Sequence, residues 1–148
     1  MREVNQAGMD IIRGFEGLRF EAYLDQANVP TIGYGHIKGV KMGDTCTRDQ
    51  AEAWLREDLA IAIHDVEDLV HVPLNDNEFA ALVSFQFNCG GLTYHDQPST
   101  MRKRLNAGLR EEAAMEFLKW THAGGHISRG LARRRDAEKA LFLKPSPS

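Results

Sequence analysis

Residues 16–36 have the sequence EGLRFEAYLDQANVPTIGYGH, from Glu16 to His36. β-Forming residues flank a turn-rich centre, so the stretch predicts a short β-hairpin. Glu16 precedes the hairpin, Asp25 enters its turn and Thr31 leaves it. Two carboxyls and a hydroxyl can therefore converge on one bond of a substrate.

The chain before this stretch has the periodicity of a short amphipathic helix. Asn5 is a good N-cap, apolar residues follow at helical spacing, and the helix is expected to run to Phe15. Gly17 then ends the helix and leaves Glu16 at its C-terminal end. The negative end of the helix dipole disfavours an ionised carboxylate there, which suits a general acid.

The chain after this stretch is predicted to be almost entirely helical. Thr47 and Gln50 form a capping box that opens the longest helix, about Thr47 to Val70. Shorter helices are expected from Asn75 to Gly90, from Ser99 or Thr100 to Gly108, through Ala113 and Phe117 to Gly124, and from Ser128 to about Leu143. The predicted fold class is α+β, mainly α, with a small β-hairpin lobe and a helical lobe joined by the long central helix.

The composition indicates one globular domain, because 148 residues with 43% hydrophobic content can bury a core without disulfide bonds. We expect this domain over 1–148, with the first helix and β lobe in about 1–46, the helical lobe in 47–144 and a tail in 145–148. The sequence has no run of about 18 apolar residues, so no integral membrane segment is expected. Cys46 and Cys89 are interpreted as free thiols.

The net charge of −3 hides an asymmetry along the chain. Residues 1–98 carry 7 Lys and Arg against 16 Asp and Glu, whereas residues 99–148 carry 11 against 5. A basic C-terminal third is typical of contact with a polyanion such as nucleic acid, anionic lipid or a bacterial envelope. A solvated helix face would give the same pattern.

Two further patterns in the sequence argue against other classes of site. The run from Arg133 to Arg135 lacks the interleaved aromatics and the recognisable module of nucleic-acid binding, so no nucleic acid is expected as a partner. On a helix, Arg134 or Arg135 shares the core-facing side with Leu131 and Glu138, and one of the two is expected to pair inward. The six histidines offer no pair at zinc-like helical spacing, so no metal site is expected.

Paired carboxylates point to glycoside cleavage. This reaction needs one carboxylic acid to protonate the leaving oxygen and one carboxylate to assist attack or stabilise the cationic transition state. Glu16 and Asp25 suit the two roles because a helix end and a turn are different environments. Their spacing of nine positions is common among surface acids, so the assignment depends on the residues around them.

Those residues form a dense signature. The signature resembles that of the active site of the phage-type lysozymes, glycoside hydrolase family 24. It consists of Glu16-Gly, then Tyr23 and Asp25, then the segment from Thr31 to His36. The likeness continues through later segments of the chain: Val72-Pro-Leu, Ala80 to Phe85, Phe87-Asn88, Ser99-Thr100, Arg104 to Gly108, Phe117 to Trp120, Ala123 to Gly125 and Gly130 to Glu138. It covers nearly the whole sequence.

The resemblance implies a muramidase, or endolysin, that hydrolyses the β-1,4 bond between N-acetylmuramic acid and N-acetylglucosamine in peptidoglycan for host cell lysis. It implies Glu16 as the catalytic acid, Asp25 as the carboxylate that works with the attacking water, and Thr31 as the hydroxyl that holds this water. Family members similar to this chain are regarded as inverting, which requires room for a water beside Asp25.

The resemblance also gives candidates for substrate binding. Phe87 and Asn88 resemble the family's cleft wall and are expected to contact sugar. His36 is a third candidate, although a structural role is favoured in which it braces the hairpin through a hydrogen bond. No cofactor is implied, and the expected partner is bacterial peptidoglycan.

The resemblance further implies a place of action. The chain begins only a few residues before the first predicted helix, unlike secreted relatives with an apolar N-terminus. We therefore expect a monomer that waits in the host cytoplasm and reaches the periplasm and cell wall after a holin acts.

Three hypotheses remain open at this level. The first is a hydrolytic peptidoglycan glycosidase, and a variant of it is a lytic transglycosylase of the same fold, which typically needs only one acid. The presence of Asp25 and Thr31 beside Glu16 favours hydrolysis. The third is a non-catalytic protein that binds the wall or another polyanion through the basic C-terminal region, in which case Glu16 would be an ordinary surface acid.

Overall fold

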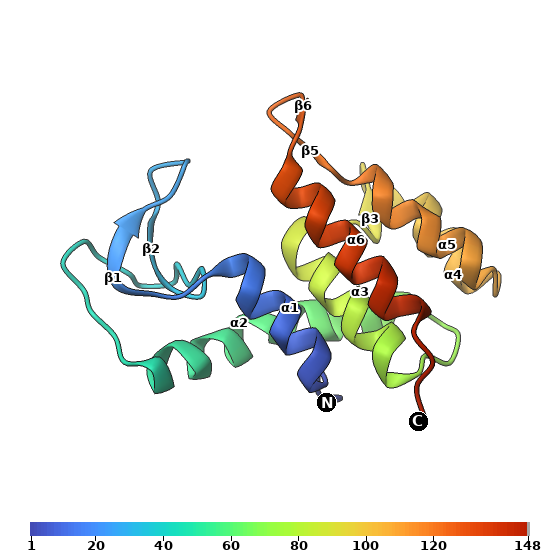
Figure 1. Ribbon diagram of the computed structural model, residues 1–148, viewed down its shortest axis with the longest axis horizontal. Helices are drawn as coiled ribbons and strands as arrows, with labels where there is room; N and C mark the ends of the chain where they lie inside the picture. The colour runs from blue at the N-terminus through green and yellow to red at the C-terminus, as the bar shows by residue number, and fades with distance from the viewer. Residues whose placement is uncertain (148) are drawn as a thin grey trace. The chain divides into compact units, whose positions relative to one another are not determined.

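The computed structural model of the chain describes residues 1–147 (Figure 1). Its helices are α1 (Gln6–Glu16), α2 (Arg48–Leu69), α3 (Asp76–Cys89), α4 (Thr100–Asn106), α5 (Arg110–Glu116), the 3₁₀ turn η1 (Phe117–Lys119) and α6 (Arg129–Leu143). Its strands are β1 (Arg19–Leu24), β2 (Pro30–Gly33), β3 (Thr93–Tyr94), β4 (Gln97–Pro98), β5 (His122–Ala123) and β6 (His126–Ile127). The predicted α+β, mainly α class is confirmed.

The described residues divide into two compact units. One comprises residues 13–60, and the other comprises residues 1–12 together with those from Ile61 onward. Helix α2 is continuous through the boundary, as expected for the predicted long helix. The expected tail follows α6, and its last residue, Ser148, lies outside the described residues. None of the helices formed by residues 1–147 is long and apolar enough to cross a membrane.

The helix starts follow the local sequence. The Asn5 side chain accepts a hydrogen bond from the backbone N–H of Gly8 at 3.0 Å, which caps α1. At the start of α2, the Gln50 N–H donates to the Thr47 hydroxyl at 3.1 Å, and the Thr47 N–H donates to the Gln50 side chain at 2.8 Å. This reciprocal pair is the predicted capping box. Ser99 and Ser128 cap α4 and α6, and each hydroxyl accepts a hydrogen bond from one backbone N–H.

The unit of residues 13–60 is built on the predicted hairpin. Strands β1 and β2 are antiparallel, with Tyr23 opposite Thr31 and Leu24 opposite Pro30. The chain then turns back on itself, and Ile32 and His36 exchange two backbone hydrogen bonds of 2.9 Å. The first half of α2 completes this unit.

The other unit has a core of helices and aromatic rings. Helices α3 and α6 lie side by side (Figure 1). Phe79, Phe85 and Phe117 are fully buried among them. The rings of Phe85 and Phe117 meet edge to face at 5.1 Å, a geometry that aromatic pairs favour.

Two small hairpins in this unit were not predicted. The helix expected to continue to Gly124 is wrong beyond α5 and η1, because Trp120 leaves the helical region with φ −103° and ψ 57°. Gly124 and Gly125 instead form the loop between β5 and β6, with φ of +58° and +82°. Two successive residues with positive φ are what a two-residue hairpin turn of type I′ requires, and glycine supplies them without strain.

Candidate active site

Glu16 is the last residue of α1, as predicted. Gly17 ends the helix with φ +74°, and its N–H donates to the Arg13 carbonyl at 2.9 Å. The Glu16 side chain is half-buried and faces the turn after β2. Its Oε1 atom lies 3.0 Å from the point that a Cβ atom would occupy at Gly35. The carboxyl can therefore lie this close to position 35 only because Gly35 has no side chain.

Asp25 begins the turn between β1 and β2, and the turn fixes its carboxyl. Its Oδ1 atom accepts hydrogen bonds from the N–H groups of Ala27 at 2.8 Å and of Val29 at 2.9 Å. This is the arrangement in which an aspartate side chain shapes its own turn. Because both bonds use Oδ1, the Oδ2 atom is the acceptor that remains for a water or a substrate. The residue is half-buried.

Thr31 stands at the other end of the same turn and is 3% exposed. Its hydroxyl donates a hydrogen bond of 2.8 Å to the carbonyl of Val29. A hydroxyl has one hydrogen, so the Oγ1 atom can offer only its lone pairs to a further partner. The structure therefore makes Thr31 an acceptor.

The His36 side chain contacts residues of α2 and is not exposed to solvent. The side chain is buried, with a residue exposure of 5%. Its Nδ1 atom lies 2.9 Å from Oδ2 of Asp58, and its ring stacks on that of Trp54 at 4.6 Å and 6°. The expected hydrogen bond is present, and it holds the turn that includes Gly35. A contact between His36 and substrate stays a prediction.

Phe87 and Asn88 lie at the C-terminal end of α3, in the unit that does not contain Glu16, Asp25 and Thr31. Both are half-buried. The Asn88 Oδ1 atom accepts a hydrogen bond from Nη2 of Arg135. Their proposed contact with sugar stays a prediction.

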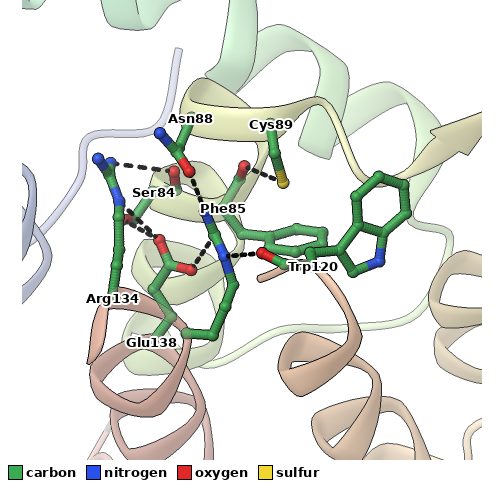
Figure 2. A network of polar contacts seen from close by, with 8 residues as sticks. Ser84, Phe85, Asn88, Cys89, Trp120, Arg134 and Glu138 are labelled. Atoms are coloured by element: carbon green, nitrogen blue, oxygen red, sulfur yellow. Dashed lines mark hydrogen bonds and ion pairs between the residues drawn. The ribbon is translucent and has the colours of Figure 1, made fainter. Parts of the chain in front are cut away.

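A buried polar network lies beneath Asn88 (Figure 2), and most of it was not predicted from the sequence. We expected one of Arg134 and Arg135 to pair inward, but both are buried and both bind the carboxylate of Glu138. Ser84 also donates to this carboxylate. The alignment of Glu138 with these arginines on one helix face was the available signal, whereas nothing in the sequence marked Ser84 as a partner.

Burial shifts the ionisation of two groups in this region. It raises the pKa of Glu138, although Arg135 and the hydrogen bond from Ser84 act in the opposite direction. It also raises the pKa of the Cys89 thiol to about 11. Both shifts follow from the cost of placing charge where little water surrounds it. Cys46 and Cys89 are both free thiols. Among residues 1–147, no three His, Cys, Asp or Glu side chains gather as metal ligands would.

The comparisons with known proteins agree with the geometry. A family model described as phage lysozyme matches residues 13–138. The chain belongs to the phage lysozyme family. The endolysin of Acyrthosiphon pisum secondary endosymbiont phage 1 is 41% identical over 143 residues, which are 94% of this chain and 97% of that protein. The endolysin of Bacillus phage B103 is 40% identical over 95% of this chain, which spans only 54% of that longer protein.

A solved structure extends the likeness to the whole fold. The muramidase domain of SpmX from Asticaccaulis excentricus matches with a TM-score of 0.88 and 40% identity, covering 98% of this chain and 100% of that one. The family predicted from the stretch around Glu16 is therefore confirmed. Membership makes the chain a lysozyme-type glycosidase that degrades peptidoglycan.

Proposed function

We propose that this enzyme hydrolyses the β-1,4 bond between N-acetylmuramic acid and N-acetylglucosamine, with Glu16 as general acid, Asp25 as general base and Thr31 as the residue that holds the attacking water. The main support for this proposal is that the side chains of Asp25 and Thr31 are both held by the same residue. Both are hydrogen-bonded to the backbone of Val29, and each keeps one oxygen that can only accept.

The two acceptors suit the positioning of a water. A water donates two hydrogen bonds, and here one would go to Oδ2 of Asp25 and the other to Oγ1 of Thr31. With both hydrogens held, a lone pair of the water is left to attack the anomeric carbon. Asp25 takes up the proton as the new carbon–oxygen bond forms, which is general-base catalysis. This is the inverting geometry, in which a water lies between the base and the sugar.

Glu16 would act at the leaving group. Its carboxyl gives a proton to the glycosidic oxygen as the bond to the anomeric carbon breaks. The absence of a side chain at Gly35 leaves room for the carboxyl, because Oε1 lies only 3.0 Å from the point that a Cβ atom would occupy there. A larger residue at this position would displace the acid from the single oxygen that must receive its proton.

Product analysis separates the candidate functions. Purified peptidoglycan digested in H₂¹⁸O by a hydrolase yields fragments with reducing muramic acid ends that carry one ¹⁸O atom. A lytic transglycosylase yields anhydro-muramic ends without the label, and a non-catalytic binder yields no fragments. We expect labelled reducing ends, and unlabelled anhydro ends would overturn the assignment of Asp25 and Thr31.

The biological setting is part of the same proposal. Proteins of this family similar to the chain are named endolysins. We propose that the enzyme is a monomer held in the host cytoplasm, and that it reaches the wall after a holin opens the membrane. Expression without a holin should leave host cells intact, while permeabilising the membrane should lyse them. Lysis without a holin or permeabilisation would contradict this route.

A further inference from the structure

The end of α1 that carries Glu16 is joined to α2 by an ion pair. Arg13 lies one turn before Glu16 on α1, and Glu52 lies near the start of α2. Nε of Arg13 donates to Oε1 of Glu52 at 2.8 Å, and Nη2 donates to Oε2 at 2.8 Å. Both oxygens of the carboxylate are thus bound by one planar guanidinium. Such a bidentate pair fixes the relative orientation of the two side chains as well as their distance.

The turn that faces Glu16 packs on the same part of α2. A Cβ atom at Gly33 would lie 3.2 Å from the Cβ atom of Ala51, so the backbone of the turn closely approaches this helix. Further along the turn, the ring of His36 stacks on that of Trp54 at 4.6 Å. Helix α2 is therefore the common support of the acid-bearing helix end and of the turn beside it.

Glu52 also contacts this turn directly. Tyr34 precedes Gly35, whose missing side chain leaves room for the Glu16 carboxyl, and it is only 4% exposed. The Arg13 guanidinium holds the pKa of Glu52 below its usual value, and the Tyr34 hydroxyl adds to this through a hydrogen bond to the same carboxylate, although burial acts in the opposite direction. One ionised carboxylate thus binds a side chain from each of the two segments that surround Glu16.

Stability alone gives little reason for this arrangement. The side chains of Arg13 and Glu52 are 24% and 26% exposed. Ion pairs in contact with solvent stabilise a folded protein only slightly, because water screens the charges and two long side chains must be ordered. Strict geometry with a small contribution to stability is typical of a pair that sets the position of a neighbouring group.

We propose that Arg13 and Glu52 are positioning residues, which hold the end of α1 so that the Glu16 carboxyl meets the glycosidic oxygen. The proposal rests on the proposed function, since it takes Glu16 as the general acid. The pair and the acid all lie in the unit of residues 13–60. A misplacement of a catalytic group by about 1 Å can lower the rate by about 10²-fold, so a small shift of this helix end is sufficient to impair the enzyme.

Glu52→Gln in the full chain is the first test. Glutamine keeps the shape of the side chain but places an NH₂ group where Arg13 needs an acceptor. On purified peptidoglycan, kcat should fall by about 10- to 10²-fold. The apparent KM should stay within about twofold, because the pair acts on the transition state and not on substrate binding. The melting temperature should fall by about 4 °C or less. Wild-type kcat in this variant would overturn the proposal.

Arg13→Lys separates geometry from charge. Lysine keeps the positive charge but cannot bind both carboxylate oxygens with a planar fork. We expect kcat to fall by about threefold or more, and wild-type kcat would show that the charge alone suffices and that the positioning role is wrong. Arg110→Lys is the matched control, because Arg110 pairs with Glu78 at 2.9 Å in the other unit, and it should keep kcat. Should Glu52→Gln fail to fold, Arg13→Lys decides the matter alone.

The double variant tests whether the two residues act as one contact. Arg13→Gln and Glu52→Gln each break the same pair, so combining them should lower kcat no further than the more impaired single variant. Losses of kcat that multiply would mean that the residues act independently, and the proposed pair would be wrong. Gly39→Ala controls for lost stability within the same unit, since nothing lies within 4 Å of a Cβ atom there, and it should keep kcat.

Glu16→Gln distinguishes a failure of the proposed function from a failure of the positioning role. If Glu16→Gln keeps wild-type turnover, Glu16 is not the acid and both proposals fall. If Glu16→Gln is inactive while Glu52→Gln and Arg13→Lys keep wild-type kcat, only the positioning role is wrong. We expect Glu16→Gln to be the most impaired variant, with Glu52→Gln and Arg13→Lys between it and wild type.

Discussion

The hydroxyl of Thr31 donates to the carbonyl of Val29 at 2.8 Å. The N–H of Val29 donates to Oδ1 of Asp25 at 2.9 Å. The backbone of Val29 thus sets the orientation of the Asp25 and Thr31 side chains, which are proposed to hold the attacking water. The positions of the two acceptor atoms, Oδ2 of Asp25 and Oγ1 of Thr31, therefore depend on the turn. Substitutions can test each acceptor separately.

Thr31→Val tests the acceptor on the threonine. Valine has nearly the same shape, so the buried site should stay filled, and losing one buried hydrogen bond should cost about 1 kcal/mol of the free energy of unfolding. Turnover on purified peptidoglycan should fall by about 10²-fold or more, because the water loses one of its two acceptors. Turnover within twofold of wild type, in a variant that melts normally, would show that the hydroxyl does not position the water.

Asp25→Asn separates the turn from the chemistry. The amide oxygen can still accept from the N–H groups of Ala27 and Val29, so the melting temperature should change little. The amide cannot act as a base, and turnover should fall by about 10²- to 10⁴-fold. Asp25→Ala is the matched control, because it loses the turn contacts as well and should be less stable than Asp25→Asn. Equal activity of Asp25→Asn and wild type would remove Asp25 from the mechanism.

Gly35→Ala tests the contact between the turn and Glu16. Gly35 and Gly39 have similar φ values of +80° and +72°, so alanine should strain both by about 1–2 kcal/mol. Only at Gly35 would the new Cβ meet Oε1 of Glu16, whereas nothing lies within 4 Å at Gly39. Gly35→Ala should therefore lose turnover, and Gly39→Ala should lose only stability. An equal loss of kcat in the two variants would mean that the contact has no catalytic importance.

The thiol of Cys89 should resist alkylation in the native protein. Burial raises its pKa to about 11, so only about one thiol in a thousand is a thiolate at pH 8, and the thiolate is the nucleophile. Iodoacetamide labelling followed by peptide mass spectrometry should find Cys89 unmodified in the native protein and modified after denaturation. Rapid native labelling would contradict the raised pKa of this thiol.

The exposed basic residues of the second half of the chain should steer the enzyme onto an anionic wall. Lys103, Arg129 and Arg133 suit the test because all three are exposed. Arg110 does not, since its Nε pairs with Oε2 of Glu78 at 2.9 Å. Neutralising the first three together should weaken binding to whole peptidoglycan at 0.1 M salt and flatten its salt dependence. The reason is that the Debye length is about 10 Å at 0.1 M salt and only about 3 Å at 1 M, so surface charges attract the wall mainly at the lower salt concentration. Equal salt slopes for the variant and wild type would make these residues an ordinary solvated face.

The parts of the fold decided by neighbouring residues were predictable. The caps at Asn5, Thr47 and Asn75 are each made within a few positions, and the structure contains all three. The hairpin and the placement of Glu16 at a helix end follow from the same kind of local signal. The family resemblance then added the roles of the site residues, which spacing alone did not supply.

What the sequence did not predict depends on contacts distant along the chain. Asn88 and Arg135 are separated by 47 positions, and no local pattern shows that their side chains meet. The hairpin at Gly124 was misread because a glycine pair ends helices and also forms two-residue turns. Its true start is set by Trp120, whose backbone carbonyl is held by Arg135.

The role of Glu16 is tested by the turnover of Glu16→Gln on purified peptidoglycan, with reducing ends counted and the melting temperature measured alongside. Glutamine keeps the shape of the side chain beside Gly35 but has no acidic proton to give to the leaving oxygen. We expect a folded protein that still binds the wall and whose turnover is lower by about 10²-fold or more. A variant that melts like wild type and retains more than half of its turnover would contradict the assignment of Glu16 as the acid.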